Sequence, residues 1–263
     1  MFKSFTTSQT KPTSYREEIV ARKRLYRPYV TDGLVNYYDW ANRASRNPEV
    51  SDTRLYNLVE GVGGTSTGIL LNGPSYTTNE RLIHDRHDGT NDITRFATDI
   101  TGGGITVEMV ARIRSNTNST MLYVANRNFY DIFKSNGLGF NTYNSNVWGI
   151  TDARMTELNL VGTSDSNWAY YTFFFPDNKD ITLHAKMYIN GRQETLSDVR
   201  GSSSGRASSL NAWQVIGGDN PDGVRAVAYA MNVDYAELRV YNRELSAREV
   251  AYNYGVAKSR KGV

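Results

Sequence analysis

The chain has 263 residues, with no cysteine, 22 glycines, six prolines and 12% aromatic residues, including 18 tyrosines. This length suits one large all-β domain or two small ones, and the composition favours strands and turns. The absence of cysteine excludes disulfides, thiolate metal sites and a catalytic thiol. No stretch approaches the roughly 20 apolar residues of a membrane span. The N-terminus lacks the apolar core of a secretory signal, so we expect the protein to stay in the cell or to leave it by another route.

The first 30 residues carry most of the positive charge. Seven basic and two acidic residues give this stretch a charge of +5, whereas the rest of the chain sums to −2. Such asymmetry is typical of an arm that docks on an acidic partner, the alternative being a solubilising tail. We predict an extended or partly helical arm over 1–30, with a short helix at 15–27, followed by one domain over 31–263. The predicted partner-binding residues of the arm are Arg22, Lys23, Arg24 and Arg27.

Two segments in the middle of the chain alternate between apolar and polar residues. Alternation with a period of two predicts a strand with one buried face. In residues 105–113 the predicted buried face is Ile105, Val107, Met109, Ala111 and Ile113; in 181–189 it is Ile181, Leu183, Ala185, Met187 and Ile189. The second segment ends at Asn190-Gly191, which is a strong hairpin signal because both residue types accept positive φ.

Residues 234–254, D-Y-A-E-L-R-V-Y-N-R-E-L-S-A-R-E-V-A-Y-N-Y, predict a strand followed by a helix. In the strand, Ala236, Leu238 and Val240 are expected on one side. Glu237, Arg239 and Tyr241 are expected on the other.

The helix is expected to begin at Ala247, because Ser246 and Glu249 form a capping box. The predicted apolar face of this helix is Val250, Ala251, Tyr254 and Ala257, which recur at helical spacing.

Four segments together resemble one known family. They are D-G-L-V-N-Y-Y-D-W at 32–40, Y-I-N-G-R-Q at 188–193, W-Q-V-I-G-G at 213–218 and the closing strand and helix just described. On these motifs, residues 32–254 resemble the laminin-G-like branch of the concanavalin A-like lectin/glucanase superfamily. The resemblance implies an all-β fold, a two-sheet antiparallel jelly-roll sandwich, with a short C-terminal helix.

The same superfamily includes glucanases, whose active-site strand reads E-x-D-x-x-E. The matching residues in this chain are Asn232, Asp234 and Glu237. An amide at 232 cannot form the glycosyl-enzyme ester of a retaining hydrolase. Asp234 and Glu237 would also lie on opposite faces of an unbulged strand, with Glu237 at the surface near Arg239. We therefore predict that the protein is not an enzyme.

The histidine-rich run H-D-R-H-D at 84–88 suggests a metal site only superficially. No regular structure puts both histidines and both aspartates on one side, and Arg86 lies among them. The third histidine, His184, is expected to be solvated. Asp88, Asn91 and Asp92 could supply oxygens to calcium, but an Asx turn is the favoured interpretation. We predict neither a metal nor a cofactor.

Carbohydrate binding requires an exposed aromatic ring with polar groups beside it. Trp40, Trp168 and Trp213 fall within predicted strands and are expected in the core. The predicted carbohydrate-binding residues are Trp148, Tyr143 and Asn146, which lie among turn residues. The alternative is that Trp148 covers the end of the sandwich.

The combined pattern favours a non-enzymatic structural protein of a tailed-bacteriophage particle, assembled in the host cytoplasm. In this hypothesis the arm binds other virion proteins of the head or tail, and several copies of the lectin-like domain decorate the particle. Host-surface glycans are a second expected partner, and a carbohydrate-binding adhesion module is the alternative function. Binding of the arm to nucleic acid is disfavoured, because four or five charges without a recognised motif make a small footprint. No membrane partner is expected.

Overall fold

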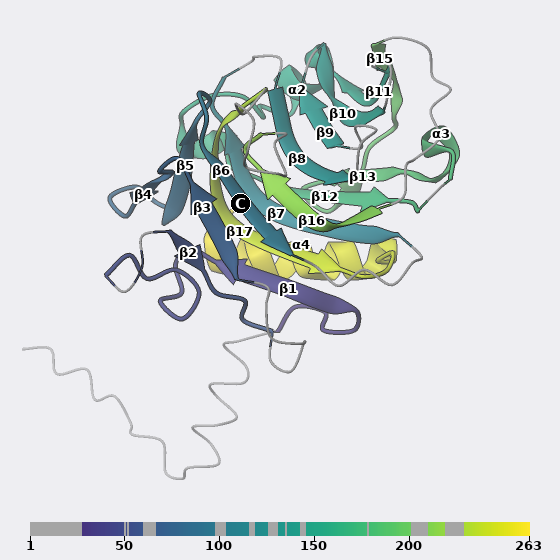
Figure 1. Ribbon diagram of the computed structural model, residues 1–263. Coiled ribbons are helices and arrows are strands. Elements are labelled where there is room, and N and C mark those ends of the chain that lie inside the picture. The colour runs from purple at the N-terminus through teal and green to yellow at the C-terminus, as the bar shows by residue number, and fades with distance from the viewer. Residues whose placement is uncertain are drawn as a thin grey trace, which may run out of the picture.

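The predicted two-sheet antiparallel jelly roll is confirmed by the computed structural model, in which two sheets face each other (Figure 1). The structure describes residues 28–263 except 50, 52, 60–66, 98–103, 116–118, 126–130, 135, 143–145, 178, 201–209 and 219–228. The predicted helix at 15–27 and the basic residues of the arm therefore lie outside the described residues. No helix in the described ranges is both long and apolar enough to cross a membrane.

The strands divide into two sheets. In spatial order, the first sheet consists of β14 (Arg192–Gln193), β13 (Lys186–Ile189), β12 (Ala169–Phe175), β7 (Ile105–Ile113), β17 (Asn232–Tyr241), β5 (His84–Asp88) and β4 (Ser75–Thr77), with β1 (Leu34–Asp39) also pairing with β17. The second sheet consists, again in spatial order, of β15 (Ser197–Arg200), β11 (Asn146–Thr151), β10 (Gly137–Thr142), β9 (Asp131–Lys134), β8 (Ser119–Ala125), β16 (Leu210–Ile216), β6 (Ile93–Ala97), β3 (Gly68–Leu71) and β2 (Arg54–Leu55). The helical segments are α2 (Asp152–Glu157), η1 (Asp165–Asn167), α3 (Ile181–His184) and α4 (Ala247–Lys261).

The main hydrophobic core lies between the two sheets. All five residues predicted for the buried face of β7 belong to it and are fully buried. Aromatic side chains cross the gap between the sheets, as where Phe140 of β10 meets Phe173 and Phe175 of β12 edge-on. Each fully buried side chain of this size stabilises the fold by about 1.5–3 kcal/mol. Period-two patterning on β7 therefore predicts the inner face correctly.

The predicted strand over 181–189 is wrong in its first half. Residues Ile181–His184 form the short helix α3, and the strand begins only at Lys186. Asp180 caps the helix by accepting a hydrogen bond from the Thr182 N–H at 2.8 Å, which favours helical backbone over extended backbone. Leu183 is consequently 75% exposed. The predicted hairpin is present, because Asn190 and Gly191 have φ of 50° and 75° and join β13 to β14.

A β-bulge in β17 corrects two further expectations. The register against β7 shifts between Tyr235 and Glu237, so that Ala236 is an extra residue. Tyr235 and Leu238 both face the main core, while Ala236 packs in a separate cluster on the outer side of the sheet. Ala236 is therefore not on the side of Leu238, as alternation predicted. The bulge also places Asp234 and Glu237 on the same, outer face.

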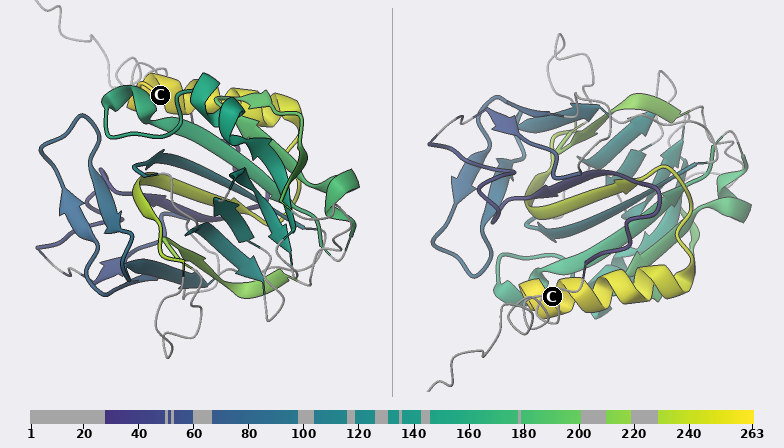
Figure 2. Two further views of the ribbon diagram at one scale, coloured as in Figure 1. Left: turned by 90° about the horizontal axis from the view of Figure 1, so that it is seen from above. Right: turned by 90° about the horizontal axis from the view of Figure 1, so that it is seen from below.

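Helix α4 covers this outer face of the first sheet (Figure 2). The predicted capping box is present, since Ser246 and Glu249 each accept a hydrogen bond from the other's backbone N–H. Val250 and Ala257 are buried as predicted, but Ala251 is exposed and Asn253 is buried in its place. Positions 250, 253 and 257 follow one side of a helix, and 251 lies about 100° away from 250. The helix thus presents a polar residue to a sheet face that is itself charged.

Candidate functional site

A network of buried charged groups lies between α4 and the first sheet. Glu108 of β7 and the pair Glu237 and Arg239 of β17 have fully buried side chains. The Arg239 guanidinium contacts Glu108 at 3.2 Å and also binds Glu237. The prediction of a surface Glu237 is therefore wrong, because α4 covers the face on which it lies.

Neutral groups complete this network. Asn253 of α4 donates a hydrogen bond to Glu108 at 2.9 Å, and Arg239 donates one to the Tyr170 hydroxyl at 2.7 Å. The guanidinium also lies over the ring of Tyr29, 3.5 Å from its centroid. Burial raises the pKa of Glu108, although the charge of Arg239 and the hydrogen bonds that Glu108 makes with Tyr170, Arg239 and Asn253 oppose the shift. Both carboxylates are fully buried beneath α4 and pair with Arg239, and Lys261 of α4 lies 3.9 Å from Glu237 as well.

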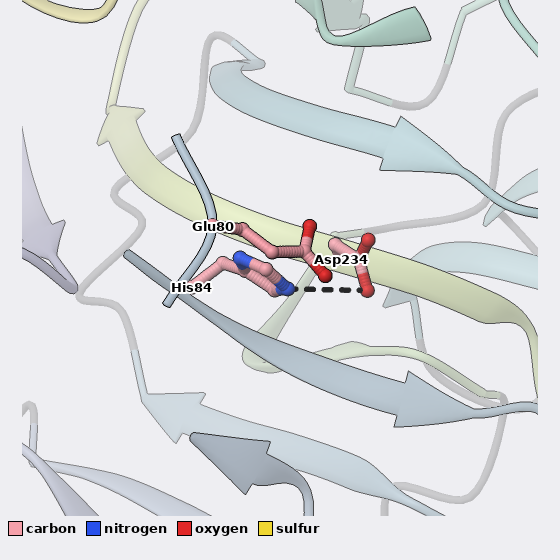
Figure 3. Close-up of side chains that lie close together, drawn as sticks. All are labelled: Glu80, His84 and Asp234. Carbon is pink, nitrogen blue, oxygen red and sulfur yellow. Dashed lines mark ion pairs between the residues drawn. The ribbon is translucent and has the colours of Figure 1, made fainter. Parts of the chain in front are cut away.

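A second cluster joins Glu80, His84 and Asp234 (Figure 3). Glu80 comes from the connection between β4 and β5, His84 is the first residue of β5, and Asp234 lies on β17. One ligand atom from each lies within 4.8 Å of the other two. His84 Nε2 is 3.6 Å from Asp234 Oδ1, and both side chains are fully buried. By distance alone, these three residues could hold a divalent cation.

Three arginines make a cation at this position unfavourable. Asp234 accepts hydrogen bonds from Arg112 Nε at 2.7 Å, Arg114 Nη1 at 2.9 Å and Arg86 Nε at 3.3 Å. Two carboxylates thus already face three guanidinium groups. A divalent ion would have to displace these hydrogen bonds and would add charge of the same sign as the arginines. We conclude that the cluster does not fit a metal ion.

Asp85 and His87 of β5 point to the inner side of the sandwich, opposite to His84, as alternation requires. Asp85 accepts hydrogen bonds from Trp40 Nε1 at 2.7 Å and Arg46 Nε at 3.1 Å, and burial raises its pKa. His87 packs against the ring of Tyr235, and burial lowers its pKa to about 4. His84 therefore lies on one side of the sheet, Asp85 and His87 lie on the other, and Asp88 is exposed at the end of the strand.

The Asx-turn interpretation of residues 88–92 agrees with the hydrogen bonds there. Asp88 Oδ1 accepts from the Thr90 N–H at 2.7 Å, and Asp92 Oδ2 accepts from the Asp88 N–H at 3.1 Å. These carboxylates bond the backbone of their own turn.

Two of the predicted carbohydrate-binding residues, Asn146 and Trp148, belong to β11. Trp148 is half-buried and packs against the main core, next to the edge strand β15. Asn146 begins β11 and pairs with Thr142, while Tyr143 lies outside the described residues. Trp40 and Trp168 are buried, as predicted for core residues. The role of Trp148 in binding a ligand stays a prediction.

Sequence reasoning missed a pocket at the end of α4. It has a volume of about 520 Å³ and is lined by Tyr29, Tyr37, Leu58 and Arg260, among others. Pockets of this size, largely apolar with a few polar groups, are typical of ligand sites. Arg260 Nη1 lies 3.4 Å from the Tyr37 hydroxyl. No local motif joins residues so far apart in the chain, although Tyr37 falls within the predicted opening strand.

Comparison with known proteins identifies the family. A laminin-G family model, described as the concanavalin A-like lectin/glucanases superfamily, matches residues 87–251. The chain therefore belongs to this superfamily. None of the curated protein sequences matches it.

Solved structures with the same fold include binding domains and a sialidase. The botulinum neurotoxin serotype D binding domain has a TM-score of 0.55 and 12% identity, covering 85% of this chain and 52% of that one. The receptor-binding domain of a botulinum C/D mosaic serotype has a TM-score of 0.56 and 13% identity, covering 86% and 52%. Trypanosoma rangeli sialidase in complex with sialic acid has a TM-score of 0.56 and 11% identity, covering 88% and 34%.

The chain thus spans about half of the toxin domains and a third of the sialidase. At these identities, the likeness establishes a lectin-like fold and nothing further.

Proposed function

We propose that the protein is a non-enzymatic display and attachment protein of a tailed-bacteriophage particle, in which the N-terminal arm anchors a lectin-like domain. The observation that carries the non-enzymatic part is the state of the acidic residues on β17. Asp234 accepts hydrogen bonds from three arginines, and Glu237 is fully buried beside Arg239. A retaining hydrolase needs two accessible carboxylates about 5–5.5 Å apart across the scissile bond. These two are committed to ion pairs.

The anchoring role is supported by the way in which residues 28–30 are held. The Tyr252 hydroxyl donates a hydrogen bond to the Pro28 carbonyl at 3.0 Å, and the Val30 N–H donates one to Asn253 Oδ1 at 2.9 Å. Tyr29 is buried against Arg239. The point at which residues 1–27 join the sandwich is therefore fixed against α4. Because this junction is fixed, anchoring the arm to a partner would also fix the position of the domain.

Particle incorporation tests this proposal. Replacing Arg22, Lys23, Arg24 and Arg27 with glutamine should reduce incorporation at least tenfold, because the arm would lose its attraction to an acidic partner. The matched control replaces four exposed basic residues of the sandwich, Arg54, Arg192, Arg248 and Lys258, with glutamine. Equal incorporation of the two variants would contradict anchoring by the arm. Release of reducing sugars from a polysaccharide by the purified protein would contradict the non-enzymatic part.

A second candidate function is carbohydrate binding by the sandwich itself. It is favoured by the pocket beside Tyr37 and by the similar structures that are described as receptor-binding domains or hold sialic acid. A glycan array that includes sialylated glycans tests it, with Tyr37→Ala and Trp148→Ala to separate the pocket from the β11 candidate. Loss of binding in one variant alone would assign the site. Absence of binding to every glycan would contradict this function.

A further inference from the structure

The carboxylate of Glu80 is held in a two-arginine clamp near the surface. Its Oε1 accepts a hydrogen bond from Arg86 Nη2 at 2.9 Å, and its Oε2 accepts one from Arg112 Nη2. The Glu80 side chain is 29% exposed, whereas Asp234 beneath it is fully buried. Each oxygen of the Glu80 carboxylate thus accepts a hydrogen bond from a different arginine, and the carboxylate of a bound ligand could be held in the same way.

The clamp is preorganised by groups other than Glu80. Arg112 is almost fully buried, and its Nε and Nη1 donate to Asp234 at 2.7 Å and to the Thr163 carbonyl at 2.9 Å. Its guanidinium also lies 4.9 Å from the centroid of the Trp168 ring. These contacts fix the direction of Nη2 whether or not Glu80 is present. A fixed donor costs little ordering entropy when it binds an anion.

Charge in the clamp favours an anion once Glu80 is removed. Arg86, Arg112 and Arg114 surround Asp234 alone, which leaves an excess of positive charge. A further acid, Asp165, is half-exposed and 3.9 Å from Arg112 Nη1. Burial would raise the pKa of Glu80, but the hydrogen bond and charge of Arg112 outweigh it and hold this pKa below its ordinary value. Glu80 is therefore an ionised ligand of the clamp at neutral pH.

We propose that Arg86 and Arg112 form a binding site for the carboxylate of an acidic saccharide, which Glu80 occupies in cis. Glu80 belongs to the connection between β4 and β5, so a movement of this connection withdraws the carboxylate without disturbing Asp234 or the two arginines. The incoming uronate carboxylate takes the same two hydrogen bonds. The choice of a saccharide rests on the proposed carbohydrate binding, whereas the carboxylate site itself does not.

Removal of Glu80 gives the first test. We expect sodium acetate to raise the thermal midpoint of Glu80→Ala but not that of the wild type, with sodium chloride at equal ionic strength as the control. Glu157→Ala is the matched variant, because Glu157 is an exposed acid that pairs with an arginine elsewhere. It should show no response to acetate. If acetate stabilises Glu80→Ala no more than chloride does, Glu80 only joins Arg86 of β5 to Arg112 of β7 by ion pairs, and the proposal is overturned.

Titration with glucuronate, and with glucose as its neutral counterpart, gives the second test. We expect Glu80→Ala to bind glucuronate at least tenfold more tightly than the wild type, and Glu80→Ala/Arg86→Gln to lose this gain. A response to acetate without binding of glucuronate would overturn the saccharide assignment. Unchanged binding of neutral glycans in these variants, together with no gain in glucuronate affinity, would leave the proposed carbohydrate function intact and overturn this inference alone. Should Glu80→Ala fail to fold, Glu80→Ser, which also empties the clamp, must show the same gain in glucuronate affinity.

Discussion

The inner and outer faces of the first sheet are both buried, but they are stabilised in different ways. The inner face packs apolar side chains such as Met109 and Leu238 against the second sheet. The outer face carries Glu108, Glu237 and Arg239 under α4, with tyrosines and Asn253 around them. Removal of a residue on the inner face leaves a cavity, whereas removal on the outer face leaves an unpaired charge. Both changes destabilise the fold, but hydrophobic patterning in the sequence predicts only which residues lie on the inner face.

The largest effect is expected from Arg239→Ala. It leaves Glu108 buried without its counter-charge and Glu237 with Lys261 alone, 3.9 Å away, and should destabilise the fold by about 3–5 kcal/mol in urea unfolding. Arg43→Ala is the control, because its pair with Glu49 is exposed and should contribute about 0–1 kcal/mol. A combined Arg239→Met, Glu108→Gln and Glu237→Gln variant should recover much of the loss. If it does not, the network stabilises through packing rather than charge balance.

On the inner face, Met109→Ala should cost about 2–5 kcal/mol, since the fully buried side chain is replaced by a cavity. Leu183→Ala, on the exposed side of α3, should change stability by about 0.5 kcal/mol or less. Unlike Arg239→Ala, Met109→Ala should be insensitive to pH and salt. A strong salt dependence for Met109→Ala would contradict the division between the two faces.

His87 makes one part of the inner side sensitive to pH. Its pKa in the folded protein is about 4, below the 6.5 of a free imidazole, because burial penalises the charged form. The unfolded chain therefore binds more protons between these values, and stability falls as pH decreases from about 6.5 to about 4, by roughly 3 kcal/mol. Asp85 has a raised pKa and acts in the opposite direction. The measurement is the difference in free energy of unfolding between the wild type and His87→Gln at each pH, in which the contribution of Asp85 cancels. A difference that does not change with pH would contradict this role of His87.

The smallest effect is expected from Ser246→Ala, which removes the side-chain cap of α4 and should cost about 1 kcal/mol. Because α4 covers the charged face, the loss should be accompanied by faster hydrogen exchange at Asn253 than at core strand β7. Uniform exchange across both would indicate that α4 and the sheet open as one unit.

The hydrogen bond from Arg243 lowers the pKa of the Glu249 carboxyl group to about 2. The ionised carboxylate therefore stabilises the fold above about pH 4.5, and this stabilisation is lost as the pH falls from about 4.5 to about 2.

Several elements could be predicted because their signals are local. The inner residues of β7, the Asn190-Gly191 hairpin and the capping box of α4 each depend on residues adjacent in the chain, and each agrees with the structure. The start of β13 could not be predicted, since the cap by Asp180 competes with a continuous alternating pattern. The bulge at Ala236 has no sequence signal in β17 alone, because it depends on the register against β7.

The sequence by itself determined the fold, because alternation, turn residues and capping are encoded over short distances and all favour a lectin-like sandwich. It also excluded the ester-forming carboxylate at position 232, since Asn232 has an amide. Only the tertiary structure decided which charged residues are buried. Glu237 and Arg239 look like surface residues until α4, encoded downstream, covers them. Likewise, the two-arginine clamp around Glu80 and the pocket at Tyr37 are formed by segments that are distant in the chain, so no local sequence pattern predicts them.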